Sequence, residues 1–426
     1  MDKKYRIDKI NSYNGWDPLK QVILGNIYKP EFFEDLPDPR TRDLMQQLLY
    51  ETHEDLDNIQ KTMEDLGVDV VRTPSNATMV SGLSKVGNSE IPEHTTVMEW
   101  WESERDSGRK LNGIPKPCLA PRDMFITMGD KLLYTCGYIG EPSDLRHVLP
   151  LSENLISPDV MDMRLAKQDN TMTMQEWTSK RGPFKLSDEY MKEQGFDPAW
   201  NEPRDGFKPP ADKNHKYYQY LKSTHAFWAP TVTRCGDRLI VDNLDVKNLS
   251  SVMEQMYPQF KTPNVAIGGH NDGTFNLPKP GLAICAPWMP DEAFKNTLPG
   301  WDILRIQDPE TITSDWGPWS HQKQLTQGRW WTPDMAENPE FADYVDNWLS
   351  DWVGLSEETV FEVNMLSINE STILSLNYQK EVHNKLQKHG IEPIYCRFRH
   401  RNFWDSGLHC LTVDTVREGG MQNYFE

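Results

Sequence analysis

Cys410, in the string Gly-Leu-His-Cys-Leu-Thr-Val-Asp at residues 407–414, is the side chain near the end of the chain with the clearest chemical potential. A cysteine is the best nucleophile among the side chains at neutral pH, provided that its surroundings stabilise the thiolate. The apolar, β-branched residues that follow it are typical of a strand. Most lone cysteines in such strands pack as small hydrophobic residues, so catalysis by Cys410 depends on which other groups reach it.

A second candidate is the string Gly-Gly-His-Asn-Asp-Gly at residues 268–273. In a strand, His270 and Asp272 would point to the same face, and the flanking glycines would let a ligand come close. The histidine could then act as general acid and base, and the aspartate could bind a cation. The competing interpretation is a hydrogen-bonded Asn-Asp-Gly turn without a catalytic role.

A third candidate, Asp123, ends the string Pro-Arg-Asp, which directly precedes a predicted hairpin. His270 and Asp272 precede another predicted hairpin in the same relative place. If the hairpins belong to repeated modules that close into a ring, these three residues and Cys410 would face one central cavity. Two carboxylates match a planar guanidinium, which donates paired N–H bonds. The set therefore predicts a nucleophile and a base around a bound guanidinium.

The elements that must position these residues form a repeated pattern of strand, strand, helix and strand. Strand pairs joined by a short turn are expected at residues 124–135, 232–241, 273–285 and 363–376. The last strand, with Cys410, and the first strand could supply a fifth pair. Repeats that each expose one apolar face must stack or close on one another. The predicted fold is therefore α/β, a propeller-like disc of ββαβ modules around a central cavity.

We expect the 426 residues to form a single domain, interrupted by two insertions. The first, at about residues 141–213, is polar and loop-like. The second, at about residues 307–354, carries six tryptophans, a composition that more often reflects local packing than a ligand site. Both insertions are expected to lie over the core or at a partner surface.

The composition argues against several classes of partner. The formal net charge of −19 disfavours a nucleic-acid backbone or an anionic membrane surface. No stretch approaches the roughly 18 apolar residues of a membrane span, and the charged N-terminus lacks the apolar region of a signal peptide. Six scattered cysteines without CxxC or zinc-finger spacing indicate reduced thiols in a cytoplasmic compartment and no metal site. Small-molecule partners fit better, and a symmetric homodimer is the default oligomer.

Four strings are spread over the whole chain: Trp-Asp-Pro-Leu-Lys-Gln-Val-Ile-Leu-Gly at residues 16–25, Pro-Arg-Asp at 121–123, His-Asn-Asp-Gly-Thr-Phe-Asn at 270–276 and Gly-Leu-His-Cys at 407–410. Together they resemble the amidinotransferases, which include the glycine and inosamine-phosphate amidinotransferases of the guanidino-group-modifying superfamily. The resemblance implies a five-bladed α/β propeller, the pentein fold, which agrees with the repeated modules.

The resemblance also implies a ping-pong reaction without a metal or an organic cofactor. Cys410, as a thiolate, would attack the guanidinium carbon of arginine, and His270 would protonate the departing amine, ornithine. The amidino-cysteine would then pass its amidino group to a primary amine acceptor, which His270 deprotonates. Asp123 and Asp272 would hold the guanidinium.

Two positions depart from the family's pattern. Thr231 occupies the place of an aspartate that orients the catalytic histidine, and its hydroxyl carries no charge to stabilise an imidazolium. Met289 occupies the place where relatives that use arginine and glycine carry an arginine that binds a substrate carboxylate. We therefore expect weakened acid–base catalysis, and a substrate that lacks this carboxylate or meets it differently.

Three interpretations stay open. The first is an amidinotransferase with arginine as donor and an unspecified primary amine as acceptor. The second is a guanidino hydrolase similar to arginine deiminase, in which water replaces the amine. The third is a pentein-fold binding or structural protein that keeps the pocket without turnover, which Thr231, Met289 and the tryptophan-rich insertion favour.

Overall fold

The computed structural model describes residues 6–79, 91–106, 113–134, 229–242, 257–265, 270–286, 289–306, 339–349, 362–376 and 378–425, together with Leu149, Ser250, Met253, Glu254, Trp352 and Val353. The first predicted insertion lies outside these residues except for Leu149. The second lies outside them between residues 307 and 338.

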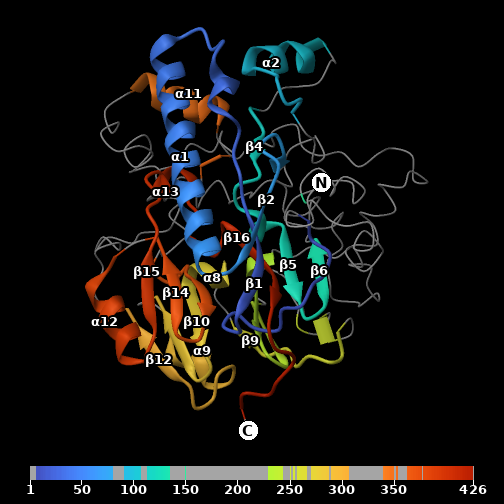
Figure 1. Cartoon of the computed structure of the whole chain (residues 1–426), viewed down its shortest axis with the longest axis vertical. Helices are drawn as coiled ribbons and strands as arrows, with labels where there is room; N and C mark the ends of the chain where they lie inside the picture. The colour runs from blue at the N-terminus through green and yellow to red at the C-terminus, as the bar shows by residue number, and fades with distance from the viewer. Residues whose placement is uncertain are drawn as a thin grey trace, which may run out of the picture.

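The first and last strands of the chain lie side by side in one sheet (Figure 1). β1 (Leu19–Leu24) pairs antiparallel with β16 (Thr412–Arg417) and parallel with β2 (Asp69–Arg72). Between β1 and β2 the chain forms α1 (Pro39–Asp65), which packs against β2. The predicted pairing of the last strand with the first is confirmed, and it brings Cys410 to the start of β16.

Three further sheets repeat this strand order, since in each an antiparallel pair is followed by a third strand parallel to the second. Their strands are β7 (Val232–Cys235), β8 (Arg238–Asp242) and β9 (Asn264–Val265); β10 (Phe275–Lys279), β11 (Leu282–Cys285) and β12 (Asp302–Arg305); β13 (Leu366–Asn369), β14 (Thr372–Ser375) and β15 (Glu392–Tyr395). Helices α9 (Asp291–Lys295) and α12 (Lys380–Lys388) precede β12 and β15.

A fifth antiparallel pair is β5 (Phe125–Met128) with β6 (Lys131–Tyr134), and a short ribbon joins β3 (Thr78–Met79) to β4 (Lys116–Pro117). All four predicted hairpins are therefore confirmed, and the fold is α/β. The strand order also supports the predicted module, whereas closure of the sheets into a five-bladed ring stays a prediction.

One predicted strand is a helical turn instead. Residues Asn271–Thr274 form α8, with His270 as the residue before its first turn. The carbonyl of His270 accepts hydrogen bonds from the N–H of Gly273 at 3.2 Å and from Oγ1 of Thr274 at 2.6 Å, which closes the turn. The expectation that His270 and Asp272 share one face of a strand was therefore wrong, because the strand begins only at Phe275.

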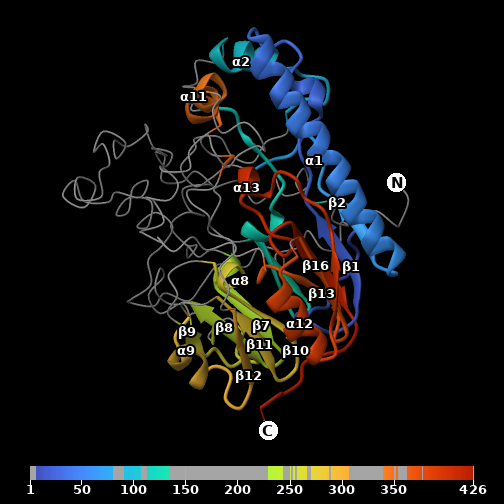
Figure 2. The same ribbon diagram turned by 90° about the vertical axis from the view of Figure 1, so that its left-hand side faces the viewer.

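The end of the molecule away from the small sheets is built from helices around the first half of α1, as Figures 1 and 2 show. They are η2 (Pro30–Phe33), α2 (Val97–Asp106) and α11 (Pro339–Trp348). Trp352, from the second predicted insertion, is fully buried and stacks on Trp404 of α13 (Arg401–Trp404) with ring centroids 5.5 Å apart. Local packing therefore accounts for this tryptophan.

Within the described part of the chain, no helix combines the length and the apolar character needed to cross a membrane. Nor do the His, Cys, Asp and Glu side chains of these residues form a group that could hold a metal ion.

Candidate active site

Cys410 lies in a tight turn directly before β16, not within the strand as the sequence suggested. The N–H of Leu411 donates to the carbonyl of Gly407, and the N–H of Thr412 donates to the carbonyl of His409, both at 3.1 Å. The turn leaves Cys410 only 3% exposed. The reactivity of its thiol therefore depends on the side chains packed around it.

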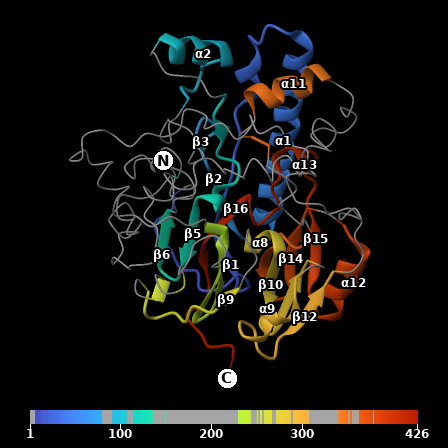
Figure 3. The same ribbon diagram turned by 180° about the vertical axis from the view of Figure 1, so that it is seen from behind.

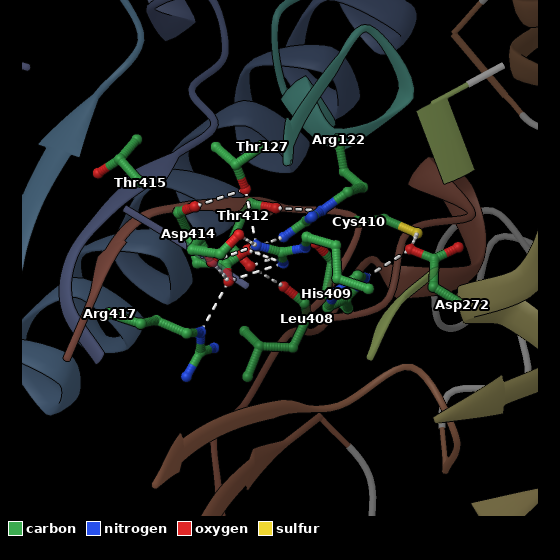
Figure 4. A network of polar contacts seen from close by, with 12 residues as sticks. Arg122, Thr127, Asp272, Leu408, His409, Cys410, Thr412, Asp414, Thr415 and Arg417 are labelled. Atoms are coloured by element: carbon green, nitrogen blue, oxygen red, sulfur yellow. Dashed lines mark hydrogen bonds and ion pairs between the residues drawn. The ribbon is translucent and has the colours of Figure 1, made fainter. Parts of the chain in front are cut away.

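Asp272 reaches the thiol from α8, which directly precedes β10 (Figure 3), and its carboxylate lies beside the sulfur of Cys410 (Figure 4). Its Oδ2 lies 3.5 Å from Sγ of Cys410, which donates to it, and 2.7 Å from Nδ1 of His409. Its other oxygen, Oδ1, is buried and has no hydrogen-bond partner among the described residues. Because an unpaired buried carboxylate oxygen costs free energy, this position favours a ligand that donates N–H groups.

Burial and the charges around Cys410 both favour the protonated form of its thiol. Burial raises the pKa of Cys410 well above the ordinary thiol value, and the negative charges of Asp272 and Asp123 raise this pKa further. Burial alone would also raise the pKa of Asp272, but the hydrogen bond and charge of His409, with the charge of His270, lower it below its usual value. The resting site therefore holds an ionised carboxylate beside a neutral thiol.

Four of the predicted site residues thus lie in one place. Asp123 ends the short helix η3 (Pro121–Asp123), and the backbone N–H of its neighbour Arg122 donates to the carbonyl of Cys410 at 3.4 Å. His270 precedes α8, within electrostatic range of Asp272. The structure brings these groups together, and their catalytic roles stay predictions.

The other two predicted residues, Thr231 and Met289, are both buried. Thr231 is buried in η8 (Ala229–Thr231), and its carbonyl accepts a hydrogen bond at 3.0 Å from the side chain of Asn271, the residue after His270. Met289 is buried in a hydrophobic cluster with Cys285 and Phe294, and its carbonyl accepts a hydrogen bond from Arg305. Among the described contacts, none joins the Met289 side chain to Cys410 or Asp272.

Sequence reasoning missed two residues that contact the reactive groups. His409 stands beside Cys410 in the quoted string, but its bond to Asp272 joins positions 137 residues apart. Asn364 donates from Nδ2 to Sγ of Cys410 at 3.0 Å. No motif marks Asn364, because it lies between apolar residues at the start of an ordinary strand pattern.

A buried charge cluster around Asp414, drawn in Figure 4, anchors the strand that follows Cys410. Both carboxylate oxygens accept hydrogen bonds at 2.7 Å from Arg234, and single bonds of 2.7 Å come from Arg122 and from Nε of Arg417. Ser12 adds a bond of 2.9 Å from Oγ. Because Arg122 belongs to η3, Arg234 to β7 and Ser12 to the segment before β1, the cluster ties three parts of the fold to β16.

Comparison with protein-family models finds no match. Individual curated proteins do match part of the sequence. The chain is 27% identical to the mitochondrial glycine amidinotransferase of Xenopus laevis over 167 residues, which is 39% of this chain and 30% of that protein. It is 26% identical to the enzyme of Danio rerio over 213 residues, or 47% of this chain and 40% of that protein. The chain thus matches less than half the length of these relatives.

Solved structures match over nearly the whole chain. An amidinotransferase of the saxitoxin biosynthetic pathway from Microseira wollei superposes with a TM-score of 0.53 and 16% identity, covering 98% of this chain and 99% of that one. The inosamine-phosphate amidinotransferase from Streptomyces griseus gives 0.50 and 16%, covering 97% and 99%. The chain therefore has the α/β fold seen in these amidinotransferases. With the sequence matches to glycine amidinotransferases, this confirms the expected resemblance to the amidinotransferase family.

Proposed function

We propose that this chain is an amidinotransferase that moves the amidino group of arginine, or of a related guanidine, to a primary amine. The observation that carries the proposal is the thiol of Cys410, 3.5 Å from the carboxylate of Asp272, whose Oδ1 has no partner within the described part of the chain. A guanidinium supplies the N–H groups that Oδ1 lacks, and its carbon would then lie beside the sulfur. The similarity to glycine amidinotransferases supports this assignment.

The reaction divides into two half-reactions at Cys410. In the first, His270 takes the proton of the Cys410 thiol, Sγ bonds to the guanidinium carbon while the bond from that carbon to the departing amine breaks, and His270 gives the proton to this amine. In the second, His270 takes a proton from the incoming amine, whose nitrogen bonds to the amidino carbon as the carbon–sulfur bond breaks, and the proton then returns from His270 to Sγ. Asp272 and Asp123 hold the guanidinium throughout.

The remaining sequence predictions enter the same proposal. Thr231 would support His270 through the turn that it holds at Asn271, and Met289 would border the substrate. The five strand pairs would close into a five-bladed pentein ring, within a single domain of residues 1–426. A cytoplasmic location and a symmetric homodimer stay predictions of the sequence.

Covalent chemistry at Cys410 is tested directly by mass. After incubation with arginine, the intact protein is expected to gain one amidino group, which peptide mapping should place on Cys410. The Cys410→Ala variant is the control and should gain nothing. A wild-type protein that stays unmodified after long exposure to arginine and other guanidines would instead favour a binding protein without turnover.

Products separate transfer from hydrolysis. With labelled arginine, transfer predicts that ornithine accumulates only when a suitable primary amine is added. Accumulation of citrulline, with or without an amine, would mean that water is the acceptor and that the chain is a guanidino hydrolase.

The Thr231→Asp variant is expected to raise the rate of amidino transfer about tenfold or more, because a carboxylate at this position would stabilise the protonated His270. Initial rates at saturating arginine measure the effect. Thr231→Asn is the matched control, since it has nearly the same shape as aspartate without the charge. A loss of rate in the stably folded Thr231→Asp protein would show that Thr231 does not occupy the histidine-orienting place.

A further inference from the structure

Asn364 holds the backbone of the turn that carries Cys410. It is completely buried, and its Oδ1 accepts the N–H of His409 at 2.8 Å and the N–H of Cys410 at 3.1 Å. Its backbone carbonyl accepts the N–H of Leu408 at 3.1 Å. Three consecutive residues of the turn are therefore fixed to this one asparagine.

These contacts fix which way the amide of Asn364 points. Because Oδ1 faces two backbone donors, Nδ2 must occupy the other position. There it donates to the carbonyl of Asp272 at 3.1 Å and to Sγ of Cys410 at 3.0 Å. If the amide were flipped by 180°, Nδ2 would face the two backbone N–H groups, and Oδ1 would face the carbonyl oxygen of Asp272 and the sulfur of Cys410. The surrounding backbone therefore requires that Nδ2, the hydrogen-bond donor, face the sulfur.

Gly407 leaves the space in which Asn364 sits. A side chain built on this glycine would place its Cβ 2.4 Å from Cβ, Cγ and Oδ1 of Asn364, far inside contact distance. The glycine in the string Gly-Leu-His-Cys is thus required by the close approach of the asparagine. The string and Asn364 form one unit, although they are separated by more than 40 residues of sequence.

We propose that Asn364 is a further catalytic residue of this site, whose side-chain N–H stabilises the Cys410 thiolate while its oxygen fixes the turn. The step rests on the proposed amidino transfer, in which the sulfur must lose its proton to His270 before it bonds to the guanidinium carbon. Asn364 keeps its own protons and supplies only a hydrogen bond, which shortens and strengthens toward an ionised acceptor.

The charges around the sulfur explain why such a donor matters. Asp272 accepts a hydrogen bond from the thiol, and as an anion it opposes formation of the thiolate at 3.5 Å. The N–H of Asn364 acts in the opposite direction, since it lowers the pKa that burial and the aspartates raise. The balance between these two neighbours sets how much thiolate is present when a guanidinium binds.

The test measures the ionisation of Cys410 without any turnover. Alkylation of Cys410 by iodoacetamide, followed by peptide mapping across a range of pH, gives the apparent pKa of the thiol. Asn364→Asp keeps an oxygen for the two backbone N–H groups and replaces the donor toward Sγ by an acceptor. In this variant we expect the apparent pKa of the Cys410 thiol to rise by about one unit or more. At a fixed pH below this pKa, alkylation should then be about tenfold slower than in the wild type.

Asn276 provides a matched control from β10. Its side chain donates to the carbonyls of Val363 at 3.0 Å and Met365 at 2.8 Å, on either side of Asn364, and no contact among the described residues joins it to the sulfur. Asn276→Ala therefore loosens the same segment and is expected to leave the apparent pKa of Cys410 nearly unchanged. Gly407→Ala should displace Asn364 and raise the apparent pKa as Asn364→Asp does.

The outcomes separate a catalytic role from a structural one. Equal shifts in Asn276→Ala and Asn364→Asp, or no shift in Asn364→Asp, would overturn the proposal. Absence of an amidino adduct in the wild-type protein would contradict the proposed function. The alkylation profiles would still decide whether Asn364 stabilises the Cys410 thiolate, because they need no turnover.

Discussion

Replacement of Asp414 by asparagine is expected to destabilise the folded chain by about 3–5 kcal/mol, the usual cost of breaking a buried ion pair. Asp414 accepts hydrogen bonds from Arg122, Arg234 and Arg417, and all four side chains are buried. An amide cannot neutralise these guanidiniums, so the variant leaves their charges crowded around a neutral group. Urea unfolding at neutral pH measures the change as a lower midpoint.

Asp65→Asn is the control for this prediction. Asp65 pairs with Lys61 at 2.6 Å, but both side chains are largely exposed, at 66% and 71%. Water screens such a pair, so its loss should leave the unfolding midpoint nearly unchanged. An Asp414→Asn protein as stable as Asp65→Asn would mean that the buried arginines find other partners.

The stability difference between the wild type and Asp414→Asn is also expected to depend on pH. Burial would raise the pKa of Asp414, but Arg234, Arg417 and Arg122 together hold it well below the usual carboxyl range. In the unfolded chain this carboxyl has its ordinary pKa of about 4. The stabilisation is therefore fully present above about pH 5 and is lost as the pH falls from there toward the depressed folded pKa. Urea unfolding of the wild type and of Asp414→Asn, at pH 7 and at acidic pH, should show a smaller stability difference at the acidic pH.

Much of the fold could be predicted because its signals are local. The hairpins at β7–β8 and β10–β11 appear in the sequence as paired apolar runs around short turns, and each turn glycine takes a positive φ. The repeated order of the modules then predicts corresponding positions for Asp123 and Asp272 and places them around one cavity with Cys410. Neither inference needs the details of side-chain packing.

The parts that could not be predicted depend on contacts between distant segments. Asn364 and Asp414 lie in apolar runs whose pattern indicates only strands. The partners of Asn364 include α8 and the turn before β16, and those of Asp414 include η3 and β7, all far away in the sequence. The region of Asp272 was predicted as a strand because apolar residues follow it, whereas the hydrogen bonds at His270 make it a helical turn. Asp272 nevertheless reaches Cys410 from this turn, with Oδ2 3.5 Å from Sγ.

Replacement of Asp272 by asparagine is expected to change two measurable rates in opposite directions. Amidino transfer from arginine should fall roughly 30- to 4,000-fold, the factor that corresponds to the loss of about 2–5 kcal/mol when one partner of a buried charged pair is removed. The asparagine can no longer neutralise a guanidinium at the position of Oδ1, and it weakens the bond from His409. Values of kcat/KM for arginine measure this loss.

Alkylation of Cys410 at neutral pH should instead become faster in Asp272→Asn, by about tenfold for a shift of one unit in the thiol pKa. Burial is the largest cause of this raised pKa, and the negative charge of Asp272 is the next. Removal of that charge should therefore shift the alkylation profile to lower pH. Asp65→Asn should change neither rate. If transfer and alkylation both fell in Asp272→Asn, the carboxylate would only support the shape of the turn. Opposite changes would show that the same charge suppresses the free thiolate and holds the cationic substrate that the thiolate attacks.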